Sequence, residues 1–167
     1  MALHRLTSIE VGVPDPEPVA AFYRDFGLEP TASGGFATRD GGEQLRLVTT
    51  PHRRLVELGI GAEDADDLDR VARSLAALDV ETRREESRVT AVEPVTGTRV
   101  VVEIAPRYAP APWEPDPLNA PGHASRRNAR ASAVLRDGEV RPSKLGHVVL
   151  GSPDQAATQR FRSEERR

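Results

Sequence analysis

The sequence contains no cysteine, few aromatic residues and no long apolar run. Without cysteine it can form neither disulfides nor thiolate metal sites, and cysteine usage says nothing about the compartment. Because no run of 18 apolar residues occurs, we expect no transmembrane helix and no membrane partner. The first residues lead into a strand pattern without an apolar signal segment, so the default expectation is a cytoplasmic protein.

The charge of the chain is unevenly distributed. The 167 residues carry a net charge of −3, yet ten basic and five acidic residues follow Gly122, which leaves about −8 on residues 1–121. A basic tail can bind nucleic acid, but this one lacks interleaved aromatic residues and any nucleic-acid-binding motif. We therefore expect no nucleic-acid partner. The length allows one domain of about 100–150 residues and a remainder.

A short phrase occurs twice, once near each end of the chain. Gly12-x-Pro14-Asp15 matches Gly151-x-Pro153-Asp154 without a gap. The second copy has His147 where the first has Ser8, and neutral imidazole at the start of a buried strand can bind a metal. The comparison makes His147 a candidate metal ligand.

Residues 1–50 predict one strand, one helix and three further strands. An apolar, β-rich segment at 6–13 precedes Pro14, and Asp15 is suited to cap a helix that begins with Pro16 and ends at Gly27. Turn-forming residues then separate three short strand candidates at 29–32, 35–39 and 43–48.

Residues 53–106 repeat this order. A strand at 54–60 and a helix at 64–78 precede strands at 80–83, 88–92 and 98–104. Phe26-Gly-Leu-Glu matches Leu78-Asp-Val-Glu at the helix exits, and Gly42 and Gly97 each stand nine residues before a proline. We therefore predict an α+β fold in which two βαβββ modules, 1–50 and 53–106, form one curved mixed sheet with the helices outside.

The remainder differs in composition. Residues 107–143 are a proline-rich linker, and 144–167 begin like a third module, with a strand predicted at Lys144–Gly151 and a helix from Gln155 to Phe161. The repeat match breaks after Phe161. We expect a truncated start of a second domain.

The pattern resembles the vicinal oxygen chelate superfamily, which includes glyoxalases, bleomycin-resistance proteins and type I extradiol ring-cleaving dioxygenases. The resemblance rests on Val11-Gly-Val-Pro-Asp, on Ala21-Phe-Tyr-Arg-Asp-Phe-Gly-Leu and on Leu145-Gly-His-Val-Val-Leu-Gly-Ser-Pro-Asp. It implies four modules in two domains, with ferrous iron held in the second domain by two histidines and one glutamate. His147 stands where that resemblance places the first histidine, and the other two ligands are expected beyond residue 167.

The resemblance also implies ligand positions in the first two modules. They fall at Ser8, Glu57 and Val101, with Arg46 as the repeat partner of Val101. Serine is a poor metal ligand, valine is none, and arginine repels a cation. We therefore expect this part to hold no Fe(II) and treat the four residues as possible pocket residues. Glu103, which shares strand parity with Val101, is a fifth.

Glu57 lies on an otherwise apolar strand, and a buried carboxylate needs a partner. Arg46 is the natural one if both side chains face inward, so an Arg46–Glu57 ion pair is a possible structural replacement for a lost metal site.

Three functions remain open at this stage. The chain resembles part of an extradiol dioxygenase, in which intact relatives would cleave catechol-type rings with Fe(II) and O2 in aromatic catabolism, while this chain alone would be inactive. Alternatively it is a metal-free module that binds a small, possibly aromatic molecule, as bleomycin-resistance-like proteins do as dimers. In the third case the unpaired strand predicted at Lys144–Gly151 adds to a sheet edge of the same or another chain, which makes a homodimer a possible assembly. Whether the chain is an enzyme stays open.

Overall fold

The computed structural model describes residues 3–109, 112, 119–125, 128 and 141–164. Within these residues, three helices and one eight-stranded sheet are formed in the order β1 (Arg5–Val13), α1 (Pro16–Asp25), β2 (Glu29–Pro30), β3 (Phe36–Thr38), β4 (Gly42–Thr49), β5 (Arg54–Ala62), α2 (Ala65–Ala76), β6 (Thr82–Arg84), β7 (Arg88–Val92), β8 (Arg99–Ile104) and α3 (Gln155–Glu164). The predicted α+β class and the two βαβββ modules are confirmed.

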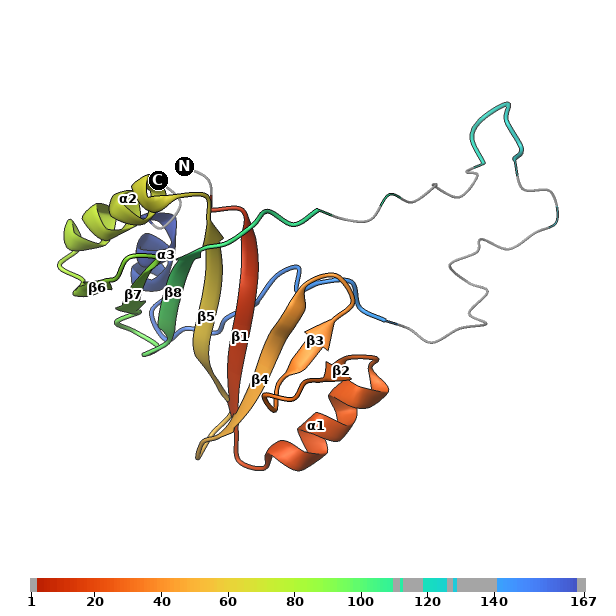
Figure 1. Cartoon of the computed structure of the whole chain (residues 1–167), viewed down its shortest axis with the longest axis horizontal. Coiled ribbons are helices and arrows are strands. Elements are labelled where there is room, and N and C mark those ends of the chain that lie inside the picture. Colours follow the sequence, from red (N-terminus) through yellow and green to blue (C-terminus); the bar gives the residue numbers. More distant parts are fainter. Residues whose placement is uncertain (1–2, 110–111, 113–118, 126–127, 129–140, 165–167) are drawn as a thin grey trace.

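The sheet joins the two modules through their first strands. Its strand order is β2-β3-β4-β1-β5-β8-β7-β6, and β1 and β5 pair antiparallel at the centre. Each first strand also pairs parallel with the last strand of its own module, β1 with β4 and β5 with β8. The sheet is therefore mixed, and the two modules repeat each other about its middle (Figure 1).

The matched sequence positions adopt the same backbone conformation in both modules. Gly27 and Asp79, which follow α1 and α2, have φ values of 93° and 57°. Gly42 and Gly97, which lead into β4 and β8, have φ values of 72° and 68°. These left-handed turns are the local reason why the repeated sequence gives a repeated chain path.

Helices α1 and α2 both cover the outer face of the sheet, but they bury different numbers of side chains against it. Helix α2 begins at its cap Asp64 and buries Leu68, Val71 and Leu75 against β7 and β8. Helix α1, capped by Asp15 through a 3.2 Å hydrogen bond from the Glu17 amide, has no fully buried residue. The larger core therefore lies under α2.

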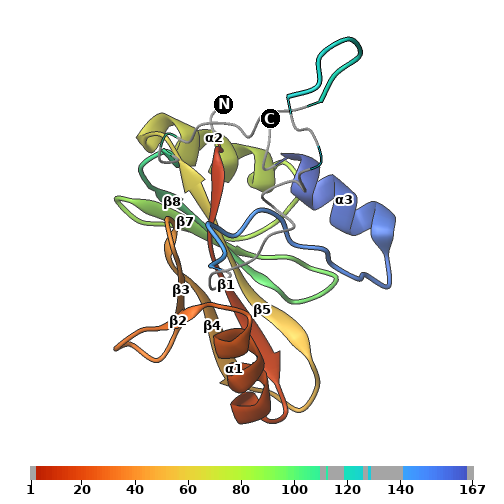
Figure 2. The same ribbon diagram turned by 90° about the vertical axis from the view of Figure 1, so that its right-hand side faces the viewer.

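Helix α3 packs into the same core. Phe161 is only 2% exposed and belongs to the cluster that contains Leu68, Val71 and Leu75. Thr158 donates a 3.3 Å hydrogen bond to the buried carboxylate of Glu93. Helix α3, which follows the second copy of the repeated phrase, thus packs beside α2 (Figure 2).

The strand predicted at Lys144–Gly151 is wrong, because the structure has coil there. The segment crosses the outer face of the sheet instead of lying along one of its edges, and no strand of the described sheet pairs with it (Figure 1). The Leu145 amide donates to the Gln44 side chain at 2.8 Å, and just before the segment the Pro142 carbonyl accepts from the Arg39 amide at 2.9 Å.

Candidate functional site

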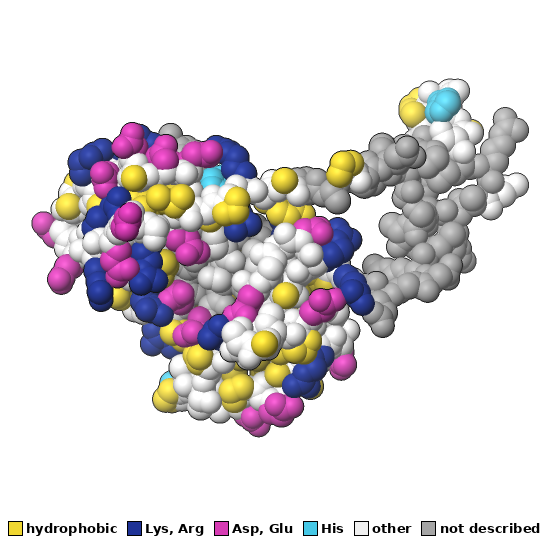
Figure 3. All heavy atoms as spheres, viewed as in Figure 1, with side chains coloured by type: hydrophobic (Ala, Val, Ile, Leu, Met, Phe, Trp, Pro, Cys, Tyr) yellow, Lys and Arg dark blue, Asp and Glu magenta, His cyan; other side chains and the backbone are white. Residues whose placement is uncertain are grey.

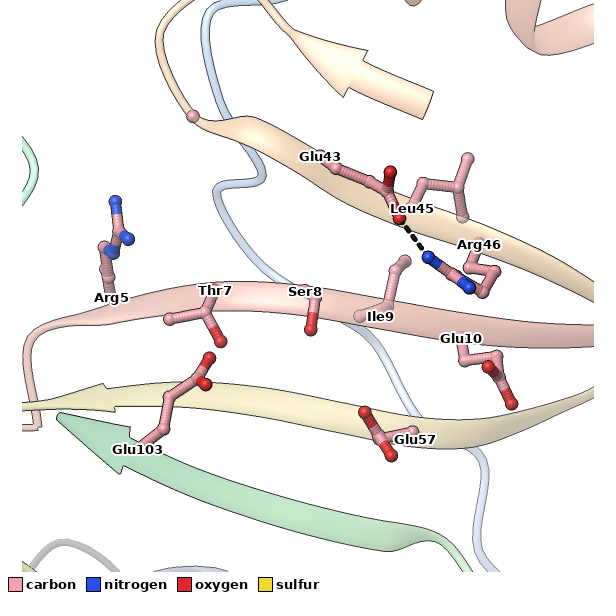
Figure 4. Close-up of a pocket in the computed structure, with 11 residues that line it drawn as sticks. Arg5, Thr7, Ser8, Ile9, Glu10, Glu43, Leu45, Arg46, Glu57 and Glu103 are labelled. Carbon is pink, nitrogen blue, oxygen red and sulfur yellow. Dashed lines mark hydrogen bonds and ion pairs between the residues drawn. The ribbon is translucent and has the colours of Figure 1, made fainter. Parts of the chain in front are cut away.

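The inner face of the sheet carries two adjoining hollows of about 480 and 310 Å³. Ser8 of β1, Glu57 of β5 and Glu103 of β8 line both of them. Figure 4 shows these side chains projecting from neighbouring strands on one face, and Figure 3 shows acidic and basic side chains next to one another on the corresponding surface.

All five predicted pocket residues lie on this face. Arg46 lines the first hollow and Val101 the second, beside the three shared residues. The structure therefore brings together residues that are 93 positions apart in the sequence, Ser8 and Val101.

Four charged residues form a row across four strands. Glu10 is in register with Arg46 on one side and with Glu57 on the other, and Glu57 is in register with Arg99. Glu57 forms an ion pair with Arg99. Arg46 pairs instead with Glu43 of its own strand, at 2.5 Å.

The expected Arg46–Glu57 pair is therefore wrong, although both side chains face the same hollow. Strand β1 lies between β4 and β5, which separates the two backbones by two strand spacings, roughly 10 Å. Glu10 occupies the space between them, and each of the two side chains has a nearer partner. Arg46 and Glu57 are each neutralised by a nearer residue and not by one another across the hollow.

Hydrogen bonds hold Glu43 as a carboxylate. The hydroxyl groups of Ser33 and Thr31 and the guanidinium of Arg46 donate to it, and they lower the pKa of Glu43 to about 2. The same contact raises the pKa of Arg46, with smaller contributions from Glu10 and Glu57. Arg46 is therefore permanently charged and fixed at the edge of the hollow.

A glycine at the centre of the face was not predicted. Gly59 is in register with Ser8 and Val101, and a Cβ placed on it would lie 2.4 Å from Thr7 Oγ1 and 2.5 Å from Ser8 Oγ. A register shift between Leu6 and Ser8 brings the two hydroxyl groups together here. Gln44 supports this irregular backbone by donating to the carbonyls of Leu6 and Thr7 at 3.0 and 3.3 Å. The only local signal was the glycine itself.

The side chains of this face do not fit ferrous iron. Within the described ranges, no three histidine, cysteine, aspartate or glutamate side chains are grouped so that they could hold a metal ion. Of the three positions that the resemblance assigns to ligands, only Glu57 is a carboxylate, and Arg99 neutralises it. An iron site of two histidines and one glutamate cannot be assembled from this set.

His147 lies apart from these residues. It is exposed on the coil segment that crosses the outer face, and it lines neither hollow of the inner face. Its role as a metal ligand stays a prediction.

Comparisons with known proteins identify the fold. No protein-family model and no curated protein matches the sequence. Among solved structures, a Mn(II)-bound glyoxalase from Novosphingobium aromaticivorans is similar, with 20% identity and a TM-score of 0.53 over 67% of this chain and 44% of that chain. The 2,2',3-trihydroxybiphenyl 1,2-dioxygenase of Sphingomonas wittichii RW1 is similar with 14% identity and a TM-score of 0.52, over 65% of this chain and 43% of that chain.

A catechol 2,3-dioxygenase aligns equally well, with 13% identity and a TM-score of 0.53 over 65% of this chain and 43% of that chain. The chain thus has the vicinal oxygen chelate fold of glyoxalases and extradiol dioxygenases. It spans less than half the length of each of these three proteins. No helix in the described part of the chain is long and apolar enough to cross a membrane.

Proposed function

We propose that residues 3–106 are the metal-free domain of a glyoxalase/extradiol dioxygenase-like protein, and that this chain alone does not cleave catechols. The observation that carries the proposal is the charged row on the inner face. Where the resemblance assigns metal ligands, the chain has Ser8, Val101 and a glutamate, Glu57, that is already paired with Arg99. The fold is kept while the metal chemistry of its inner face is replaced by ion pairs.

Oxygen uptake tests this proposal. Protein prepared anaerobically with ferrous iron would be mixed with catechol or 2,3-dihydroxybiphenyl in air-saturated buffer. We expect the same oxygen consumption as ferrous iron gives without protein. Ring-opened product formed in many turnovers per chain would contradict the proposal.

A second candidate function is supported by the two hollows themselves. Their combined polar lining suits a small polar ligand, and no aromatic side chain lines either of them. A flat aromatic ligand would therefore lack stacking partners, so catechol is expected to bind weakly here.

The hollows offer a simple test of binding. Ser8 lines both, so Ser8→Phe places a bulky ring where the two hollows adjoin without changing the charge. A ligand that raises the melting temperature of the wild-type protein but not that of Ser8→Phe would support the binding function. A library of small polar ligands that shifts neither protein would count against it.

A homodimer is part of this second candidate. Phe22 and Phe26 of α1 are 59% and 51% exposed and stack with ring centroids 6.0 Å apart. The residue that matches Phe22 in the second module is Ser74, so the fold itself does not require an aromatic side chain at this position. Light scattering should give a dimer for the wild type and a monomer for Phe22→Ser; a wild-type monomer would contradict this part of the proposal.

A further inference from the structure

A third hollow, of about 630 Å³, lies on the opposite face of the sheet from the charged row. Its floor comes from β1 and the start of β5, and its walls come from the 95–98 turn and from residues 148–153. Segment 148–153 leads into α3, which is anchored in the core by Phe161. The hollow therefore depends on the part of the chain that crosses the outer face (Figure 2).

Aliphatic side chains form much of this hollow. They are only half-buried, so their apolar surface is still open to a ligand: Ile9, Val11, Leu55, Val148 and Leu150. Leu55 is in register with Val11 because the ladder shifts between Glu10 and Val11. Removing such surface from water is favourable by about 25 cal/mol per Å².

The charged residues of the hollow all have the same sign. Arg53 and Arg54 line it, and no aspartate or glutamate of the described residues does. Arg54 donates one hydrogen bond, of 2.9 Å, to the Gly97 carbonyl, which leaves its other N–H groups available. Arg53 is exposed and forms no ion pair with any described residue. In the larger hollow of the inner face, by contrast, carboxylates outnumber guanidinium groups.

We infer that this hollow binds a small amphipathic anion, namely an aliphatic carboxylate of medium chain length. A guanidinium group matches a carboxylate in geometry and charge, and the aliphatic walls accommodate the hydrocarbon tail. The volume lies within the usual range of ligand pockets, roughly 300–1,000 Å³. This binding is independent of the function proposed above, because it uses the other face of the sheet.

Calorimetric titration with decanoate tests the inference on the full chain. Decanoate should bind, while decanol and hexanoate should bind at least about tenfold more weakly, since a loss of about 1.4 kcal/mol corresponds to a factor of ten. Arg53→Gln should weaken decanoate binding about tenfold and leave the weak decanol binding unchanged. The matched control Arg73→Gln removes an exposed arginine from α2 and should keep the wild-type affinity.

Leu150→Ser provides a second, uncharged variant that should weaken decanoate binding about fivefold by removing apolar surface. Three results would overturn the inference. They are the absence of decanoate binding, equal affinity for decanoate and decanol, and equal losses in Arg53→Gln and Arg73→Gln.

Discussion

Glu57 of β5 and Arg99 of β8 form an ion pair in register on the inner face of the sheet. Their side chains are 21% and 54% exposed, so the pair is partly in water. Glu57 lines both hollows of this face and Arg99 lines the second, and the pair gives Glu57 a fixed partner.

A double-mutant cycle with Glu57→Gln and Arg99→Gln should give a coupling energy of about 0.5–1 kcal/mol, the upper range for a partly exposed pair. Urea unfolding measures it. The surface pair Glu63–Arg107, with side chains 45% and 60% exposed, is a suitable control and should couple more weakly. A stronger coupling between Arg46 and Glu57 than between Arg99 and Glu57 would contradict the assignment of Arg99 as the partner of Glu57.

Stability in acid should depend on Glu43. Its pKa is lowered from 4.5 to about 2 by the hydroxyl groups of Ser33 and Thr31 and by Arg46. A lowered pKa means that the folded state favours the carboxylate, so this contribution is present above pH 4.5 and is lost as the pH falls toward 2. In Glu43→Gln the free energy of unfolding should fall less steeply over that range than in the wild type. Identical slopes would show that the hydrogen bonds do not form in solution.

A metal site should be recoverable from the fold. Ser8, Glu57 and Val101 line a common hollow, so Ser8→His combined with Val101→Glu would place three ligands around it. We expect cobalt or zinc to raise the melting temperature of this variant. Metal at 100 times its dissociation constant should add about 2.7 kcal/mol to the free energy of unfolding. Ser8→Asn combined with Val101→Gln is the control of similar size. Equal responses in both variants would mean that the three positions do not converge.

Helix α3 should contribute strongly to stability. Phe161 is 2% exposed among Leu68, Val71 and Leu75, and Phe161→Ala should cost about 3–4 kcal/mol. Val149, which is 86% exposed, provides the control, since Val149→Ala should have almost no effect. A cost below about 1 kcal/mol for Phe161→Ala would indicate that residues 155–164 do not pack on the core of residues 3–106 in solution.

The parts of this structure that could be predicted are those determined by neighbouring residues. The cap at Asp15 and the left-handed turns at Gly27 and Gly97 follow from local backbone chemistry. Their repetition gave the two modules. Four of the five possible pocket residues followed from the ligand positions that the family resemblance implies and from the repeat alignment, and Glu103 followed from strand parity. All five line the hollows of one face.

The remainder depends on register between strands, which no local pattern encodes. The partner of Glu57 is decided by which strand lies beside β5, and β1 separates it from Arg46. Gly59 acquires its role only because the shift near Ser8 places two hydroxyl groups over it. Residues 144–151 are apolar enough for a strand, but extended coil packed on a sheet face has the same composition.

Iron content after anaerobic purification with ferrous iron most directly tests the central claim that the inner face is a metal-free version of the fold. Inductively coupled plasma mass spectrometry on the desalted protein would measure it. The account predicts far less than one iron per chain, with the same value for wild type and Glu57→Gln. One iron per chain in the wild type, lost in Glu57→Gln, would contradict it.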